Sequence, residues 1–139
     1  MSFHTPQDAE AAFYTAFESK NIVDMMQVWS SDSAIECIHP MGGRLVGRQA
    51  IEDSWRQVFR NDSELLFTIE DAHYMQSSMI AVHIVSEKIA LARKPDTPTT
   101  VIATNVYQLT DHGWKMVLHH ASLSQREEDE QDHATETMH

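Results

Sequence analysis

The feature that most constrains the fold is a long stretch, residues 65–123, in which apolar and polar side chains alternate with a period of two. Alternation of this kind places successive side chains on opposite faces of a β-strand. Short connections at residues 75–78, 93–98 and 111–113 interrupt it. Because each connection is short, consecutive strands are predicted to be antiparallel neighbours in a meander. The four predicted strands cover residues 65–74, 79–92, 99–110 and 114–123.

The first part of the sequence instead has apolar side chains at three- and four-residue spacing, which is typical of helices. Thr5 and Pro6 mark a helix start, because threonine caps helices and proline suits their first position. The apolar stripe of this helix includes Phe13 and Phe17, and Glu10 is expected to lie outside the stripe. The first helix is therefore predicted to face the core.

Three further elements are predicted before the long strands. A second short helix fits residues 22–29, a strand fits residues 34–39, and Gly42 and Gly43 form a turn. Beyond Gly47 the helical spacing returns and continues to Phe59. The element order ααβαββββ predicts an α+β fold, in which an antiparallel sheet carries helices on one face.

Composition limits the number of domains and the kinds of partner. At 139 residues the chain has the size of one domain, which we place at residues 1–124, followed by an acidic and flexible tail at residues 125–139. A net charge of −11 argues against a nucleic-acid partner. We expect no membrane partner and a cytoplasmic location, because the start lacks signal-peptide features and no stretch reaches the apolar length of a bilayer.

Several strings of residues resemble a known superfamily. Residues 37–40 (Cys-Ile-His-Pro) and residues 47–51 resemble the SnoaL-like branch of the NTF2-like superfamily. Residues 103–107 and residues 114–122 resemble both that branch and the association domain of calcium/calmodulin-dependent protein kinase II. The resemblance covers roughly residues 5–124. It implies a cystatin-like cone, whose strongly curved sheet wraps around the helices and leaves a conical pocket at the wide end.

The resemblance implies one particular fold, but it does not imply one particular function. The superfamily includes ketosteroid isomerases, polyketide cyclases, dehydratases, epoxide hydrolases and non-catalytic assembly domains, and a shared fold does not choose among them. No Asp or Tyr of this chain falls on a motif position that matches the catalytic residues of the isomerases. The position that matches Asn105 holds a pocket arginine in the kinase association domain. Whether the chain is an enzyme is therefore left open.

The candidate pocket residues follow from the alternation on the last three strands. One face of residues 79–92 carries His83 and Glu87, and we expect this face to be the concave one. A tight connection at residues 111–113 would set Asn105 close to His120. A slip of one residue in the pairing would undo this placement. The predicted pocket group is therefore His83, Glu87, Asn105, His120 and Ser122.

These residue types suggest proton-transfer chemistry. A desolvated Glu87 paired with His83 or His120 would act as a base, while Asn105 donates to a developing oxyanion. The catalytic candidates are Glu87, His120 and Asn105. The alternative is that Glu87 pairs with Lys88 or Arg93 at the rim and that His120 only satisfies a hydrogen bond of the sheet. Ligand-binding candidates around this group, several of them also core candidates, are His83, Ser122, Trp55, Tyr107, Trp29 and His39.

Metal and cofactor chemistry is not expected. Cys37 and His39 lie two residues apart on a predicted strand and face the same way, yet a metal site needs three or four converging ligands. Cys37 is the only cysteine of the chain, so an intramolecular disulfide is excluded. We predict no metal and no cofactor.

The leading hypothesis is a SnoaL-like protein that binds a small apolar or carboxylated molecule in the cone pocket, as a cofactor-free lyase, isomerase or hydrolase or as a binder. The alternative is a non-enzymatic homodimeric assembly or regulatory module. A homodimer through the convex face of the sheet is predicted in both cases. The apolar residues expected on that face are Ile80, Val82, Ile84, Ile102, Val106 and Val117.

Overall fold

The computed structural model describes residues 2–32 and 34–124, and the predicted acidic tail lies outside this described part. The described chain forms three helices and six strands. The sheet has the strand order β2-β1-β6-β5-β4-β3, in which β1 and β6 are parallel and all other neighbours are antiparallel. In chain order the elements are α1 (Pro6–Ser19), α2 (Ile22–Val28), β1 (Glu36–Ile38), β2 (Arg44–Val46), α3 (Arg48–Phe59), β3 (Leu65–Gln76), β4 (Ile80–Leu91), β5 (Lys94–Thr110) and β6 (Gly113–Leu123).

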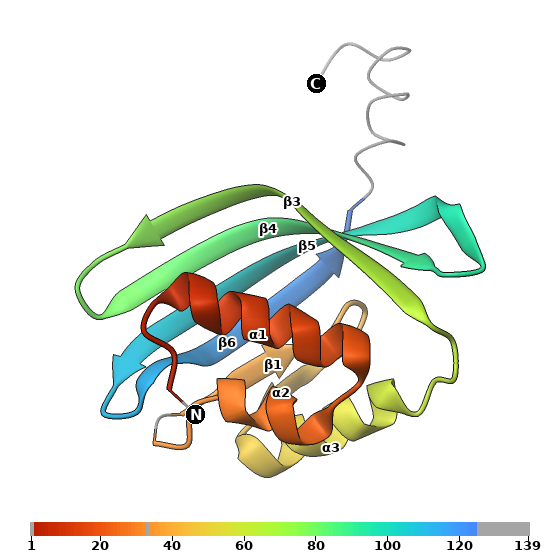
Figure 1. The fold of residues 1–139 in the computed structure, drawn as a ribbon. Helices are drawn as coiled ribbons and strands as arrows, with labels where there is room; N and C mark the ends of the chain where they lie inside the picture. Colours follow the sequence, from red (N-terminus) through yellow and green to blue (C-terminus); the bar gives the residue numbers. More distant parts are fainter. Residues whose placement is uncertain (1, 33, 125–139) are drawn as a thin grey trace.

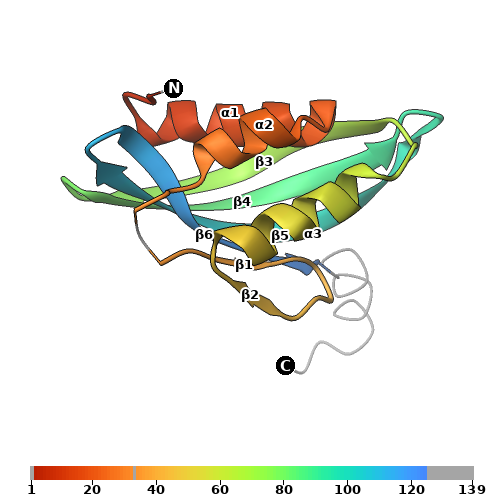
Figure 2. The same cartoon turned by 90° about the horizontal axis from the view of Figure 1, so that it is seen from below.

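The sheet is strongly curved, and the helices lie on its concave side (Figure 1). The turned view shows α1 and α2 together on one flank of the cone and α3 beside β1 and β2 (Figure 2). The predicted α+β cone and its meander from β3 to β6 are therefore confirmed. No helix in the described part of the chain is long and apolar enough to cross a membrane.

The predicted element order missed β2. This strand has three residues, two of them exposed, and pairs with β1 so that Glu36 lies opposite Val46. A strand so short at the edge of the sheet leaves no alternation to detect. The segment at residues 93–98 was predicted to be a turn, but β5 already begins at Lys94. Its prolines are tolerated because β6 pairs with β5 only from Val101 onward, so the first part of β5 is an edge.

Local side-chain caps fix the helices that cover the sheet. The Thr5 hydroxyl accepts a hydrogen bond from the Asp8 amide at 3.0 Å, which confirms the predicted start of α1. Asn21 caps α2 in the same way, through the Asp24 amide at 3.0 Å. Between them Lys20 adopts the left-handed conformation that ends α1. The sharp turn lays α2 next to α1.

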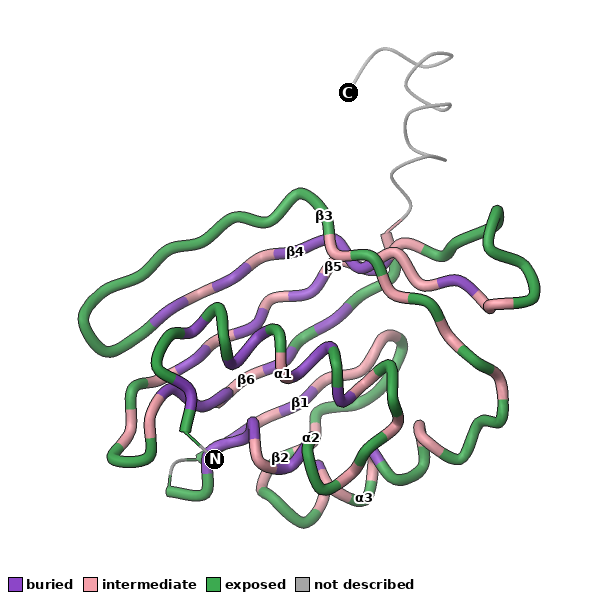
Figure 3. The backbone as a smooth tube through the Cα atoms, in the orientation of Figure 1, coloured by how far each residue is buried: buried purple, intermediate pink, exposed green. Residues whose placement is uncertain are grey.

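Burial alternates along β4 and β5, as Figure 3 shows. The inward side chains of β4 include His83 and Glu87, so the predicted concave face of this strand is confirmed. The core between helices and sheet includes a cluster of aromatic rings. Trp55 is fully buried and packs edge-on against Phe13 and Phe17, with ring centroids 5.6 and 4.8 Å apart.

A β-bulge in β6 changes which residues of this strand face inward. Val106 pairs with Leu118 but Tyr107 pairs with Met116, so Val117 is an extra residue in β6. Because an extra residue shifts the side-chain alternation by one, the faces exchange beyond it. The buried residues after the bulge are His119 and Ala121.

The predicted inward placement of His120 and Ser122 is therefore wrong. Both side chains are exposed, on the opposite face of β6 from His119. Asn105 lies opposite His119 in the ladder, one residue away from the expected neighbour. The physical reason is the bulge, which unbroken alternation does not predict.

A second irregularity bends the edge strand β3. The pairing of β3 with β4 shifts between Glu70 and His73, and Asp71 has a positive φ of 49° within this bulge. Residues of β3 beyond the bulge are exposed. Residues at this bulge, including Ile69, Asp71 and Tyr74, line a surface depression next to α1.

Candidate functional site

Polar side chains gather in the core between α1 and the inner faces of three strands, although this region of a domain is usually apolar. The helix supplies two of them and the strands β4, β5 and β6 supply the others. Each is less than 10% exposed. The members are Glu10, Tyr14, His83, Glu87, Asn105, Tyr107 and His119.

Regular spacing brings these side chains together. Glu10 and Tyr14 are four residues apart on α1 and share its inner face. On the sheet, strand pairing sets His83 opposite Asn105 and Asn105 opposite His119, in one row across three strands. Because alternate residues of a strand share a face, Glu87 lies on the same side as His83.

One half of this cluster, which we name the Glu87 chain, is a line of hydrogen bonds. The Tyr14 hydroxyl donates to Glu87 Oε2 at 2.5 Å, and Asn105 Nδ2 donates to the Tyr14 oxygen at 3.0 Å. His119 Nδ1 lies 2.6 Å from Asn105 Oδ1. Since an amide oxygen only accepts, His119 carries its proton on Nδ1. The line runs Glu87, Tyr14, Asn105, His119.

Burial shifts the ionisation of this half. It raises the pKa of Glu87 from 4.5 to about 7, and the charge of Glu10 acts in the same direction while the Tyr14 hydrogen bond opposes it. Burial also lowers the pKa of His119 from 6.5 to about 3. The pKa of Tyr14 is raised well above 10 by burial and by Glu87. At neutral pH the imidazole is therefore uncharged, the phenol is protonated, and Glu87 exists in both forms.

The other half, which we name the Glu10 triad, consists of Glu10, His83 and Tyr107 and has a different hydrogen-bond pattern. His83 Nδ1 lies 2.8 Å from Glu10 Oε2, and the Tyr107 hydroxyl donates to the same oxygen at 3.3 Å. The His83 ring packs against the rings of Tyr74 and Tyr107 in tilted arrangements, with centroids 4.2 and 5.0 Å away. Its Nε2 has no hydrogen-bond partner among the described residues. Histidine and tyrosine here both contact the carboxylate directly.

A surface depression of about 340 Å³ gives access to the cluster, and we name it the α1–β3 depression. Glu10 and Tyr14 line it from α1, and Ile69, Asp71 and Tyr74 line it from β3 next to the bulge. Glu87 and Asn105 are not in its lining. A ligand in the depression would therefore touch Glu10 and Tyr14, with Glu87 one hydrogen bond behind Tyr14.

The residues predicted for the site are brought together only in part. The cluster includes Glu87, Asn105, His83 and Tyr107, whereas Trp29 lies at a different depression next to α2. The alternative pairing of Glu87 with Lys88 or Arg93 is wrong. Glu87 is 1% exposed and bonded to Tyr14, and Lys88 contacts Glu70 at 3.7 Å instead.

Trp55 and His39 lie behind the cluster. The Trp55 ring packs against the rings of His39 and His119, with centroids 4.7 and 6.0 Å away. His39 Nε2 lies 3.0 Å from the Ser54 hydroxyl and 3.6 Å from the Cys37 sulfur. Burial raises the pKa of the Cys37 thiol to about 12, so this thiol is no nucleophile at neutral pH.

Sequence reasoning missed Glu10, Tyr14 and His119. Glu10 was expected outside the apolar stripe of its helix, and a charged residue is seldom buried without a partner. Its partner His83 lies on a distant strand, so the pair is set by the tertiary fold. The usable signal was the four-residue spacing of Glu10 and Tyr14, which places two polar groups on one helix face.

Comparisons with known proteins agree with this architecture. A family model described as a SnoaL-like domain matches residues 7–125. A solved structure from Thiobacillus denitrificans, described as a candidate calcium/calmodulin-dependent protein kinase type II association domain, is 38% identical with a TM-score of 0.84, over 90% of this chain and 99% of that one. A candidate dehydratase of the NTF2-like family from Streptomyces avermitilis is 27% identical with a TM-score of 0.76, over 86% and 99%.

Two further matches have lower sequence identity and therefore support fewer conclusions. A candidate ketosteroid isomerase from Parabacteroides distasonis shares the fold with a TM-score of 0.71 and 16% identity, over 88% of this chain and 89% of that one. The F-box protein SKIP8 of Arabidopsis thaliana is 23% identical over 114 residues, which are 80% of this chain. The chain spans only 46% of the length of that relative.

Proposed function

The chain belongs to the SnoaL-like domain family, and from that premise we propose that it binds a small molecule in the α1–β3 depression and exchanges protons with it. One observation carries this proposal. Tyr14 lines the depression and donates a 2.5 Å hydrogen bond to Glu87, a carboxyl group whose pKa is raised to about 7. A carboxyl with this pKa can release and accept protons at neutral pH.

The two carboxyl groups suit opposite roles. Glu10 lines the depression as an acceptor held by His83 and Tyr107, so it would take a proton from the ligand. A protonated Glu87 would donate to the Tyr14 oxygen, which frees the phenol hydrogen to point at the ligand. Tyr14 would then give its proton to a ligand oxygen and regain one from Glu87. The ligand loses one proton and gains another, which is the balance of a cofactor-free isomerisation, and proton exchange with solvent would return Glu10 and Glu87 to their starting forms.

The charge of the depression favours a neutral ligand. Its lining includes three carboxylates, Glu10, Glu70 and Asp71, and none of the described lining residues carries a positive charge at neutral pH. A carboxylated ligand would be repelled there. Apolar contact is available from Ile69 and the Tyr74 ring. We therefore narrow the expected ligand to a neutral molecule with one apolar side and a carbonyl or hydroxyl oxygen.

Deuterium exchange tests this proposal even when the reaction product is not identified. Neutral carbonyl compounds are screened by amide NMR for shifts at Glu10, Tyr14 and Ile69, and each compound that binds is incubated with the protein in D₂O. We expect deuterium to enter the carbon next to the carbonyl. Glu10→Gln and Tyr14→Phe should abolish this exchange while binding persists, and Glu70→Gln is the matched control. Binding elsewhere, or equal exchange in all variants, would overturn the proposal.

A second candidate function, homodimeric assembly, is favoured by the outer face of the sheet. Apolar side chains on this face are only partly buried, and Ile80 is 38% exposed. The association-domain protein from Thiobacillus denitrificans is 38% identical to this chain. Sedimentation equilibrium tests it: we expect a dimer for the native chain and a monomer for Ile84→Lys. A monomeric native chain at micromolar concentration would exclude this function.

A further inference from the structure

A second depression, of about 210 Å³, lies where the end of α2, the start of α3 and the start of β6 meet. We name it the basic depression, because Arg48 and Lys115 line it and none of its described lining residues is acidic. This is unexpected in a chain with a net charge of −11. It shares no lining residue with the α1–β3 depression. Its role is therefore separate from the proposed proton transfer.

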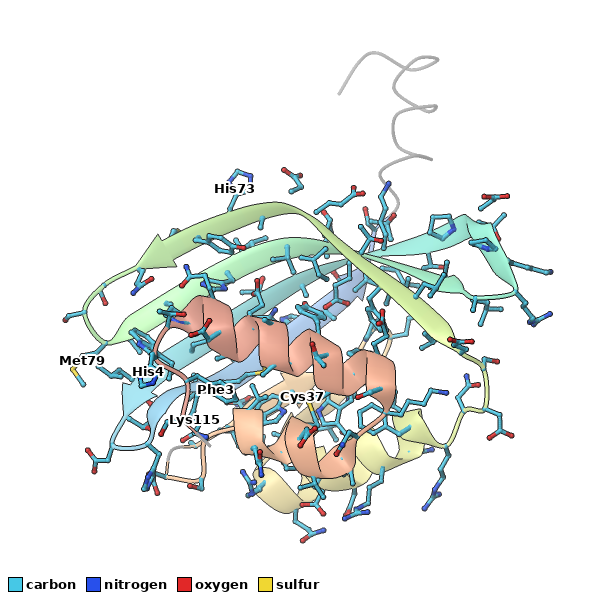
Figure 4. The ribbon with its side chains drawn as sticks, viewed as in Figure 1. Phe3, His4, Cys37, His73, Met79 and Lys115 are labelled. Atoms are coloured by element: carbon cyan, nitrogen blue, oxygen red, sulfur yellow. The ribbon has the colours of Figure 1, made fainter. Side chains whose placement is uncertain are left out.

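The two cations are held by backbone carbonyl groups at the end of α2. Arg48 donates to Met26 O at 2.6 Å and to Trp29 O at 3.4 Å. Lys115 Nζ donates to Gln27 O at 2.7 Å and lies 5.2 Å from the centre of the Phe3 ring. Figure 4 shows Lys115 next to Phe3. These contacts fix the positions of both charged groups.

The helix end does not neutralise this charge. The carbonyl end of a helix is equivalent to about half a negative charge, whereas Arg48 and Lys115 can bring two full positive charges. Burial lowers the pKa of Lys115, and the charge of Arg48 adds to this effect, so the two groups repel each other. Among the described residues Arg48 forms no ion pair. An anion between them would relieve the repulsion.

Trp29 gives an independent indication of a missing acceptor. Its side chain is 1% exposed and lines the basic depression, and its indole N–H has no hydrogen-bond partner within the described part of the chain. Buried N–H groups without partners are rare in folded proteins. Ser31 and His112 add further polar groups to the same lining. The lining thus includes two cations and a residue whose buried indole N–H is unsatisfied among the described residues.

We propose that the basic depression is a binding site for a small oxyanion, namely a phosphate or carboxylate group that accepts from Arg48, Lys115 and the indole N–H of Trp29. The volume suffices for such a group together with several further atoms, since one water molecule occupies about 30 Å³ of liquid. The anion is either an inorganic ion or the charged group of a larger metabolite, and the two sources share this chemistry.

The indole signal of Trp29 tests the proposal on the native protein. Its ¹H–¹⁵N resonance is assigned with Trp29→Phe and followed during titration with inorganic phosphate, acetate or chloride at constant ionic strength. We expect a saturable shift with phosphate or acetate and none with chloride. Phenyl phosphate binding more tightly than inorganic phosphate would identify a larger metabolite as the source. Equal responses to all three anions, or an indole N–H that is unresponsive, would overturn the site.

A charge variant gives the second measurement. Arg48→Gln should weaken phosphate binding about tenfold or more, because it removes a charge-assisted donor. Arg60→Gln is the matched control, because it removes the same charge from the opposite end of α3. Arg60 lies outside the lining of the basic depression. Folding of both variants is checked by their dispersed amide spectra. Similar affinities in the two variants would show that phosphate responds only to the net charge, which contradicts the proposal.

Discussion

The two halves of the buried cluster each contain a glutamate, a histidine and a tyrosine, but their hydrogen-bond patterns differ. In the Glu10 triad, His83 and Tyr107 both contact the carboxylate, at 2.8 and 3.3 Å. In the Glu87 chain, Tyr14 is the one described residue that hydrogen-bonds to the carboxyl group, and Asn105 lies between Tyr14 and the histidine. The difference is one intervening amide.

That amide decides how the second half ionises. His119 faces an amide oxygen rather than a carboxylate, so burial is not offset by an opposite charge and its pKa falls to about 3. Among the described residues no cation lies beside Glu87, and burial raises its pKa to about 7. The carboxyl group of Glu10 is instead held by direct contacts with His83 and Tyr107. A carboxyl group without a cation suits a group that changes its protonation at neutral pH.

The largest expected effect is acid destabilisation through His119. Its folded pKa of about 3 is below the ordinary 6.5, so the stability it contributes is fully present above pH 6.5. That stability is lost as the pH falls toward 3, because only the unfolded chain binds the proton. The loss amounts to about 5 kcal/mol in total and about 3 kcal/mol by pH 4.

Urea unfolding from pH 7 to pH 4 measures this effect, best in the Glu87→Gln background where Glu87 no longer titrates. His119→Gln should flatten the acid branch while its amide still bonds to Asn105. An acid branch of equal slope with and without His119 would show that another group controls acid unfolding.

Glu87 is expected to act with the opposite sign. Its folded pKa of about 7 lies above the ordinary 4.5, so the stability it contributes is present below pH 4.5 and is lost as the pH rises to 7. Glu87→Gln should therefore stabilise the protein by about 3 kcal/mol at pH 8 and have little effect near pH 4.5. Urea unfolding at both pH values tests this, with a change at the exposed Glu70, Glu70→Gln, as the control that should change little. A destabilised Glu87→Gln at pH 8 would contradict a desolvated carboxylate.

The sequence predicted one half of this comparison better than the other, for a physical reason. Alternation on β4 and most of β5 is local, so His83, Glu87, Asn105 and Tyr107 were placed on the inner face correctly. His119 was missed because the bulge at Val117 depends on how β6 pairs with β5. Glu10 and Tyr14 were missed because their partners come from strands far away in the sequence.

Replacing the Asn105 amide by a carboxylate should make the Glu87 chain resemble the Glu10 triad, in which a carboxylate contacts the histidine. Asn105→Asp would put a carboxylate beside His119 Nδ1, where Asn105 Oδ1 now lies at 2.6 Å. An opposite charge at this distance typically raises an imidazole pKa by about 1–3 units. The His119 ring signals, titrated by NMR in both proteins, measure the shift. A His119 pKa that stays near 3 would mean that burial sets this pKa and that the hydrogen-bond partner of the imidazole does not.

The smallest expected effects come from the two tyrosines, and their order sharpens the comparison. Tyr14 makes hydrogen bonds of 2.5 and 3.0 Å, so Tyr14→Phe removes the bond to Glu87 Oε2 and the bond from Asn105 Nδ2 and should cost about 2 kcal/mol of unfolding free energy. Tyr107 donates one bond of 3.3 Å to Glu10, which keeps His83, so Tyr107→Phe should cost about 1 kcal/mol or less. Tyr14→Phe should also move the pKa of Glu87 above 7, because the hydrogen bond that lowers it is lost. Equal costs for the two variants, with no change at Glu87, would mean that the two halves support their carboxyl groups in the same way.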